Sequence, residues 1–305
     1  MPKKIILIAG ATSSGKSKLA IEIAKKIKGE IINADSMQVY KEFSVLSSRP
    51  SKIDLKKVRH HLYGFQPAKN FFSTGAWLKL VKKQINQCLK NKKIPIIVGG
   101  TGLYFEAITK GMSKIPNIDF KERDKIRVLQ KKLGQNKFYE KLLKLDPIVK
   151  NKIQPSDTQR SIRAYEVKKF TKKSIFEWYN LTKSEFKQFQ IFKIFIDTPR
   201  EKLLKNISNR VEQMFKNNCT KEVKLFLALN IDSSLSANKI IGVKEIRDYL
   251  SGISNLSQTK ELINIKTRQY AKRQVTWARG HMSDWNKQYS NSFSSLSKKV
   301  LKAIS

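Results

Sequence analysis

Short apolar runs alternate with amphipathic segments through the first hundred residues. The runs IILIA (5–9), EIINAD (30–35) and IPIIVGG (94–100) are rich in β-branched residues and end at a glycine or an acidic residue, as buried strands do. Residues 18–27 and 75–89, which lie between them, have helical spacing. This alternation predicts a doubly wound α/β core with a parallel sheet, in which the strand ends form the ligand-binding edge.

The pattern changes near residue 110. Residues 121–190 carry helical spacing with little that resembles a strand, and FQIFKIFID (189–197) then predicts a strand followed by a Thr-Pro helix start. We therefore expect an α/β fold whose parallel sheet is flanked by helices and interrupted by an all-helical insertion. The expected domains are the first part of the core at 1–110, the insertion at 111–188, and the second part with C-terminal helices at 189–305.

The composition adds a strong positive charge to this picture. The chain has 62 Lys and Arg against 24 Asp and Glu, a formal net charge of +38, which favours a nucleic-acid partner without locating a site. Only two cysteines occur, far apart, which argues against a disulfide scaffold and a structural zinc site. Since no apolar run has the length of a signal peptide or a membrane span, we expect a cytoplasmic protein without a membrane partner.

The segment GATSSGKS (10–17) follows the first predicted strand and runs into the first predicted helix. Its G-x-x-x-x-G-K-S spacing is that of a P-loop, in which glycines permit the turns and backbone N–H groups face phosphates. Lys16 supplies a cation to the terminal phosphate, and the Ser17 hydroxyl is a ligand for Mg²⁺. Taken alone the loop favours ATP, but the same cradle serves ATPases, GTPases, kinases and other users of a diphosphate.

Two further strand ends carry candidate chemistry. Asp35, after EIINA, can accept a proton from a nucleophile or hold Mg²⁺ through water, whereas alone it is as readily the cap of a turn. Ser36 and Gln38 carry groups that can read the edge of a base. Thr101, in VGGTG, presents a hydroxyl where a helix begins, which alone favours a helix cap. Beyond EIINAD we find no convincing Walker B strand, and IPIIVGG ends in glycine, which argues against ordinary NTP hydrolysis but leaves a small-molecule or nucleoside kinase open.

Seven motifs occur in the order found in one family of enzymes. They are GATSSGKS, INADSMQVY, SSRP followed by HHLYGF, VGGTGLYF, SDTQRSIRAYEV, RVEQMF and YAKRQVTWARG. Over essentially its full length, the chain closely resembles the bacterial tRNA dimethylallyltransferases. It departs from the family pattern at Ala11, where proline is usual, at Asn218, where glycine is usual, and at Val243, where tyrosine is usual.

The resemblance implies transfer of a dimethylallyl group from dimethylallyl diphosphate to N6 of the adenosine immediately 3′ of the anticodon in tRNA, with Mg²⁺ as cofactor and a monomeric enzyme. It makes Asp35 the general base and places Thr101 beside the reacting groups. It assigns the diphosphate to Gly10, Ala11, Thr12, Ser13, Ser14, Gly15, Lys16, Ser17 and Arg210. It assigns contacts with the tRNA anticodon stem-loop to Asp35, Ser36, Met37, Gln38, Thr101, Arg123, Gln159, Arg160, Ser161, Ile162 and Arg163.

Two alternatives stay open beside this hypothesis. One is the P-loop kinase, which would consume ATP, and the other is an RNA-binding protein that uses a nucleotide only as a switch. Arg160 and Arg163 share a helix face that suits RNA phosphate as well as solvent. Tyr270 and Trp277 have the helical spacing of core residues, and the pair His60 and His61 is interpreted as structural.

Overall fold

The computed structural model describes residues 3–289 and 292–304 and divides the chain into two compact units. Unit 1 comprises Met1–Ala107 and Phe186–Ser305, and unit 2 comprises Ile108–Glu185. The chain therefore leaves the first unit, folds the second and returns. Among the described residues, no helix combines the length and the apolar character needed to cross a membrane.

Unit 1 is built on a six-stranded sheet with the order β3-β2-β4-β1-β5-β6, in which every pair is parallel. The strands are β1 (Lys4–Gly10), β2 (Gly29–Asn33), β3 (His60–His61), β4 (Ile94–Gly99), β5 (Gln190–Ile196) and β6 (Asn286–Gln288). β1 lies inside the sheet between β4 and β5, so the loop that follows it opens near the centre of the carboxyl edge. The predicted class, a parallel sheet core flanked by helices, is confirmed.

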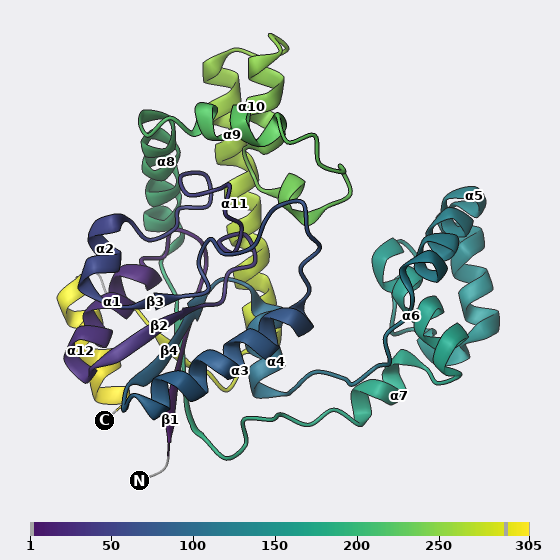
Figure 1. Ribbon diagram of the computed structural model, residues 1–305, viewed down its shortest axis with the longest axis horizontal. Coiled ribbons are helices and arrows are strands. Elements are labelled where there is room, and N and C mark those ends of the chain that lie inside the picture. The colour runs from purple at the N-terminus through teal and green to yellow at the C-terminus, as the bar shows by residue number, and fades with distance from the viewer. Residues whose placement is uncertain (1–2, 290–291, 305) are drawn as a thin grey trace. The chain divides into compact units, whose positions relative to one another are not determined.

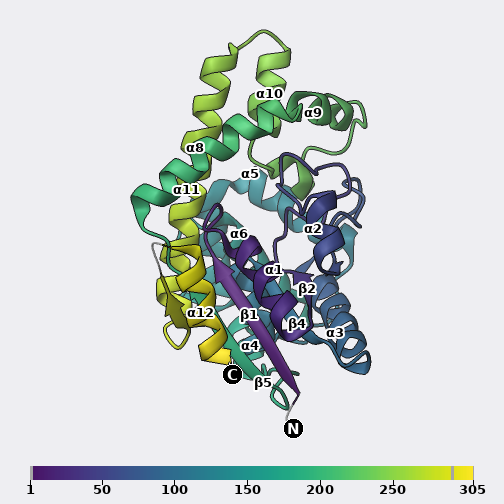
Figure 2. The same ribbon diagram turned by 90° about the vertical axis from the view of Figure 1, so that its left-hand side faces the viewer.

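Helices cover both faces of this sheet, because the strands are apolar on both sides. Ile6, Ile8 and Val98 pack into one core cluster with the buried faces of α1 (Lys16–Ile27) and α12 (Phe293–Ile304). On the opposite side, Trp77 of α3 (Thr74–Lys90) stacks on Tyr104 of α4 (Gly102–Thr109), with ring centroids 3.9 Å apart. Figure 1 shows α1 and α12 side by side, and α3 and α4 together. In both Figure 1 and Figure 2, α8 to α11 gather beyond the end of the sheet toward which β1 points.

The helices of unit 1 are α1 (Lys16–Ile27), α2 (Lys52–Lys57), α3 (Thr74–Lys90), α4 (Gly102–Thr109, which runs into unit 2), α8 (Arg200–Lys216), α9 (Cys219–Leu227), η2 (Ser236–Lys239), α10 (Val243–Leu250), α11 (Leu256–His281) and α12 (Phe293–Ile304). Asn218 precedes α9 with a φ of 58°, a left-handed conformation that asparagine tolerates better than most residues. The position where the family usually has glycine therefore keeps the conformation that glycine favours.

Some element bounds predicted from the sequence were wrong. β2 ends at Asn33 instead of residue 35, because the Asn33 side chain accepts a hydrogen bond from the Asp35 N–H at 2.8 Å and turns the chain out of the sheet. α1 begins at Lys16 instead of residue 18, directly after the P-loop glycine. The expected long loop after Asp35 contains α2 and β3, and the C-terminal segment contains β6. β3 and β6 are too short for an alternating pattern to reveal them.

Unit 2 consists of helices joined by loops. Its elements are α5 (Phe120–Leu145), η1 (Pro147–Val149), α6 (Thr158–Thr171) and α7 (Ile175–Asn180). α5 is interrupted at Gly134, whose φ of 73° is left-handed, so it is two helices across a kink. Phe138, Leu142 and Ala164 lie in the shared core of α5 and α6, which gives the unit a hydrophobic cluster of its own.

Candidate active site

Three candidate segments lie at adjacent strand ends in unit 1. The P-loop follows β1, Thr101 follows β4 and Asp35 follows β2, and these strands are neighbours in the order β2-β4-β1. The Ser36 N–H donates to Thr101 Oγ1 at 2.9 Å, and the Thr101 N–H donates to the Ala34 carbonyl at 3.2 Å. A Cβ at Gly99 would stand 1.9 Å from the Ala34 oxygen, so only glycine permits this approach. The segments that carry Asp35 and Thr101 are thus joined directly, at the sheet edge where the P-loop also begins.

The P-loop takes its shape from two left-handed residues, Ser13 with φ 61° and Gly15 with φ 84°. Its carbonyls are held from outside: Asn206 of α8 donates to the Ser13 carbonyl at 3.0 Å, and Thr198 donates to the Ser14 carbonyl at 3.2 Å. With its carbonyls turned outward to these donors, the loop leaves backbone N–H groups at the start of α1 for an anion.

Several buried polar atoms around the loop have no hydrogen-bond partner within the described residues. They are Ser13 Oγ, Ser14 Oγ and Arg210 Nε. Arg210, on α8, donates through Nη1 to Thr12 Oγ1 at 2.5 Å, so its guanidinium reaches the loop while Nε stays unused. Unpaired buried donors are costly unless a ligand satisfies them. The site is therefore built to receive a group rich in acceptor atoms.

Lys16 is a strongly perturbed cation of the site. Its ammonium donates to the Ala11 carbonyl at 3.1 Å. Burial lowers the pKa of Lys16 to about 8, the negative charge of Asp35 acts to raise it, and the positive charge of Arg210 lowers it further. Burial also lowers the pKa of the Arg210 guanidinium, and the negative charge of Asp35 acts to raise it. Two cations held away from water, each influenced by the same carboxylate, are suited to a multiply charged anion.

Asp35 sits in a turn with aromatic neighbours. Its Oδ1 accepts a hydrogen bond from the Met37 N–H at 2.9 Å, which fixes the carboxylate to its own backbone. Burial raises the pKa of the Tyr63 and Tyr270 phenols, and the negative charge of Asp35 raises both further. The Asp35 carboxylate therefore lies within electrostatic reach of two phenols that the sequence did not indicate. Nothing in the local pattern around Tyr63 or Tyr270 distinguishes them from core aromatics.

Gln274 of α11 joins two parts of the site and was not singled out from the sequence. Its Oε1 accepts from the Thr12 N–H at 2.8 Å, and its Nε2 donates to the Gly100 carbonyl at 2.9 Å. One turn further along α11, the Trp277 ring fills the space beside Gly102, where a Cβ would come within 2.3 Å of it. One face of α11 thus fastens the P-loop to the segment that carries Thr101.

The other predicted residues that follow β2 make most of their side-chain contacts with other groups of the protein. Ser36 Oγ accepts from Thr101 Oγ1 at 3.3 Å, and Met37 packs at the margin of a core cluster. Gln38 donates both amide hydrogens to backbone carbonyls, those of Ser47 at 2.9 Å and Ser48 at 2.8 Å. Gln38 therefore presents its amide oxygen, and not its amide hydrogens, to any ligand.

In unit 2, two predicted arginines converge on one buried carboxylate. Arg123 Nε and Arg163 Nη1 lie 3.2 Å and 3.0 Å from Glu166 Oε2, and Glu166 is 1% exposed. Arg160 is 74% exposed and lies 3.6 Å from Asp157. Because Glu166 neutralises only one of two cations, the surface where Arg123 and Arg163 meet keeps a positive charge.

The remaining residues of the predicted segment 159–163 differ in their burial. Ser161 is fully buried and accepts a hydrogen bond from Gln135, and Ile162 packs against the core of unit 2. Gln159 is exposed on the first turn of α6. Of the segment from 159 to 163, the outward positions are therefore those of Gln159 and Arg160.

Two groups could bear on metal binding. Ser17, exposed in the first turn of α1, makes no side-chain hydrogen bond within residues 3–289 and 292–304, so its hydroxyl is available beside the phosphate cradle. Elsewhere, Glu30, His61 and Cys88 hold three donor atoms within 4.8 Å of one another. Since His61 Nε2 already lies within hydrogen-bond distance of Glu30 Oε2, at 2.6 Å, this cluster is accounted for by a side-chain hydrogen bond joining β2 to β3.

The fold and the site define a P-loop-type α/β protein whose phosphate-binding type of loop lies at the same sheet edge as a carboxylate. Residues 38–281 match the family model described as IPP transferase, and the chain belongs to this family. It is 55% identical over 284 residues to a tRNA dimethylallyltransferase of Pelagibacter ubique, covering 93% of this chain and 91% of that protein. A tRNA dimethylallyltransferase of Rickettsia canadensis is 41% identical and covers 92% and 87%, respectively.

Solved structures give the same answer for the fold. A eukaryotic dimethylallyltransferase acting on tRNA matches with a TM-score of 0.81 and 26% identity, over 94% of this chain and 73% of that one. These relatives make the chain a prenyltransferase and give no support to the kinase alternative.

Proposed function

We propose that this enzyme transfers the dimethylallyl group of dimethylallyl diphosphate to N6 of the adenosine immediately 3′ of the anticodon in tRNA. The observation that carries the proposal is that Asp35, Lys16 and Arg210 interact electrostatically at one edge of the sheet, where the negative charge of Asp35 acts to raise the pKa of both buried cations. A kinase needs the phosphate cradle as well, but the names of the relatives favour a prenyl donor.

The geometry suits each part of this reaction. The N6 amine of adenine is a weak nucleophile, so a carboxylate that takes its proton while the N–C bond forms lowers the barrier. Asp35 fills this role because its turn directs Oδ1 to the Met37 N–H and leaves Oδ2 for a proton. The C–O bond to the donor breaks in the same step, and its electron pair leaves with the diphosphate. Lys16, Arg210 and the loop amides stabilise that departing charge.

Mg²⁺ fits the donor set of the site. This ion prefers oxygen ligands and keeps several waters when it binds phosphates. The free Ser17 hydroxyl and the Asp35 carboxylate, the latter through water, would hold it beside the loop. Bound there, it would add positive charge to the leaving diphosphate.

The tRNA contacts that we propose lie in both units: Asp35 to Gln38 and Thr101 at the strand ends, and Arg123 and residues 159–163 in unit 2. The adenine must leave its stack to reach Asp35, which costs a few kcal/mol and favours a single-stranded loop as target. A tRNA substrate implies work in the cytoplasm, and we propose that the enzyme acts as a monomer.

One assay separates this proposal from its rivals. Purified enzyme, Mg²⁺, labelled dimethylallyl diphosphate and unmodified tRNA with adenosine 3′ of the anticodon should yield labelled tRNA. ATP turnover without labelled tRNA would establish a kinase. RNA affinity that follows the bound nucleotide without any product would establish a switch.

Replacing Gln274 with alanine should lower kcat/KM for the donor about 10- to 100-fold, because the P-loop loses its tie to the Gly100 carbonyl and the reacting groups lose their alignment. Steady-state kinetics with varied donor measure this. The matched control is Gln269→Ala on the exposed side of the same helix, which should change kcat/KM less than twofold. An equal effect in both variants would contradict the positioning role of Gln274.

A further inference from the structure

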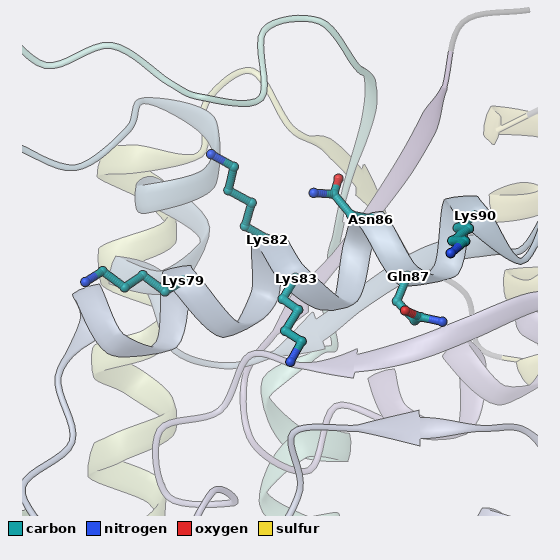
Figure 3. A pocket seen from close by; sticks show the side chains of 6 residues that line it. All are labelled: Lys79, Lys82, Lys83, Asn86, Gln87 and Lys90. Atoms are coloured by element: carbon teal, nitrogen blue, oxygen red, sulfur yellow. The ribbon is translucent and has the colours of Figure 1, made fainter.

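One exposed face of α3 carries a row of polar side chains that the proposed reaction does not use. We call it the lysine stripe, and it consists of Lys79, Lys82, Lys83, Asn86, Gln87 and Lys90. The six side chains line a shallow hollow of about 450 Å³. Figure 3 shows them along a single helix. Their spacing of three and four residues places them on one side, opposite the buried Trp77, Val81, Ile85 and Cys88.

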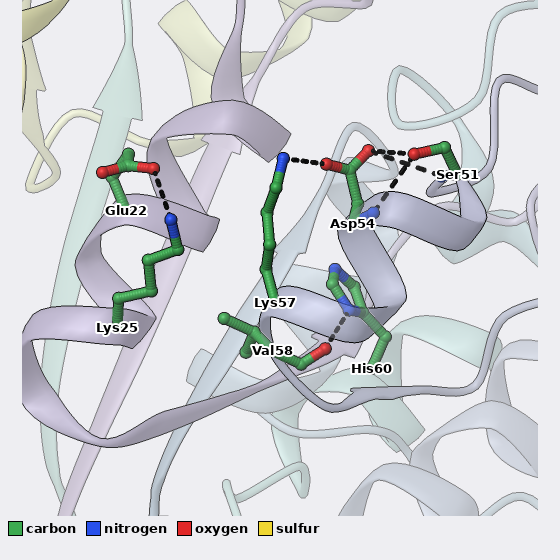
Figure 4. Close-up of polar contacts among 7 residues, drawn as sticks. All are labelled: Glu22, Lys25, Ser51, Asp54, Lys57, Val58 and His60. Atoms are coloured by element: carbon green, nitrogen blue, oxygen red, sulfur yellow. Dashed lines mark hydrogen bonds and ion pairs between the residues drawn. The ribbon is translucent and has the colours of Figure 1, made fainter.

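The charge of the lysine stripe is not compensated by acidic residues nearby in sequence. α3 contains no Asp or Glu, and none occurs between Asp54 and Glu106. Within the part of the chain that the structure describes, Lys79, Lys83 and Lys90 form no salt bridge. Lysines on other helices behave differently. Lys25 lies 3.3 Å from Glu22, and Lys57 lies 3.1 Å from Asp54. Figure 4 draws both ion pairs as dashed lines.

Lysines at this spacing, with no acidic residue in the same helix, are unfavourable for the helix itself. Like charges three and four residues apart repel by a few tenths of a kcal/mol per pair, and a lysine with an acid one turn away gains a similar amount. Because α3 contains no acidic residue, the lysine stripe lacks this stabilisation at each of its turns. A solvated lysine-rich face accounts for single lysines, whereas Lys79, Lys83 and Lys90, which lie on one face of the helix and form no salt bridge within the described residues, present the row of positive charge that a polyanion requires.

The lysine stripe also begins beside the active site. Trp77 Nε1, on the buried side of α3, donates to the Asn33 carbonyl at 2.9 Å, two residues before Asp35. The N-terminal part of α3 is thereby fixed at the carboxyl end of β2. From Lys79 to Lys90 the row runs about 16 Å along the helix, away from that edge. This length matches several successive phosphates of a nucleic-acid strand, which a single bound anion would not need.

We propose that the lysine stripe binds the phosphate backbone of the tRNA substrate outside the loop that enters the active site. The lysine ammonium groups contact phosphates, and the amides of Asn86 and Gln87 donate hydrogen bonds to phosphate or ribose oxygens. Such contacts fix the register of the RNA and carry no sequence information. The proposal rests on the proposed function for the identity of the RNA.

The test is direct binding of unmodified tRNA, without donor, at several salt concentrations. The triple variant Lys79→Gln, Lys83→Gln, Lys90→Gln should raise Kd at least tenfold at low salt and reduce the slope of log Kd against log salt by about two to three, since each lysine releases about one counterion. The triple arginine variant at the same positions should keep the wild-type slope. The matched control, Lys216→Gln, Lys221→Gln, Lys224→Gln, removes the same charge from exposed positions on α8 and α9.

If the stripe variant and the control triple lost the same tRNA affinity, the proposal would be overturned, because the loss of net positive charge alone would then explain the weaker binding. Thermal unfolding shows whether the exposed substitutions leave the fold intact. In the transfer assay, the stripe variant should raise KM for tRNA while kcat at saturating tRNA stays within twofold. Failure of the wild-type enzyme to transfer the prenyl group would refute the proposed function, whereas the binding comparison would still decide the role of the stripe.

Discussion

Replacing Asp35 with asparagine should lower the rate of prenyl transfer by about 10²- to 10⁴-fold, the usual contribution of a positioned general base. The asparagine keeps an oxygen that can accept from the Met37 N–H, so the turn and the Ser36–Thr101 contact persist. What it loses is the capacity to take the proton from N6 of adenine. Single-turnover measurements with saturating donor and tRNA isolate this step.

A control for this substitution is available in the same chain. Asp232 also accepts, through Oδ1, a hydrogen bond from the N–H two residues on, that of Ser234, but it lies in an exposed turn. Asp232→Asn should therefore leave the rate within twofold. The tRNA Kd of the Asp35 variant should change less than threefold. A rate loss matched by an equal loss of tRNA affinity would show that Asp35 binds RNA instead of accepting a proton.

The sheet and the strand-end residues were predictable because both depend on local patterns. Runs such as IILIA are apolar on both faces and end at the glycine that opens the P-loop, so the strand, the loop and the helix after it follow from neighbours in sequence. Asp35 and Thr101 were expected at the same edge since the carboxyl ends of parallel strands meet there. Their direct connection through Ser36 agrees with that expectation.

The residues that complete the site were not predictable, because their roles arise from contacts across the whole chain. Gln274 meets the Thr12 N–H across 262 positions of sequence. Tyr270 precedes it by one helical turn and has the spacing of a core residue. Asn206 supports the P-loop from α8 through a single amide that no local motif identifies. Long-range pairing of this kind depends on how helices pack on the sheet, which the period of apolar residues does not specify.

In unit 2 the sequence indicated which residues are charged but not which of them face solvent. Arg160 and Arg163 were expected on one face of the helix, and the structure gives them different partners, Asp157 and Glu166. The buried Glu166 pairs with Arg163 and also with Arg123, on α5. The spacing of three residues is correct for a shared face, but the position of Glu166 inside the unit is a consequence of tertiary packing.

Replacing Lys16 with methionine should reduce kcat/KM for the donor by about 10²- to 10³-fold, the effect of removing one preorganised group that faces developing negative charge. The methylene stem is largely preserved, so the loop that is held by Asn206 and Thr198 keeps its shape. Lys26→Met, on the exposed side of the same helix, is the matched control and should change kcat/KM less than twofold.

The pH dependence of donor binding provides an independent measure of the same residue. Burial lowers the pKa of Lys16 to about 8 in the free enzyme, so the ammonium is charged below that pH and neutral above it. A diphosphate binds the charged form, and its binding therefore takes up a proton at higher pH. The donor Kd should be level below pH 8 and rise up to tenfold per pH unit above it. The Lys16→Arg variant stays charged and should lose this dependence. A wild-type Kd that stays level from pH 7 to pH 10 would contradict contact between Lys16 and the diphosphate.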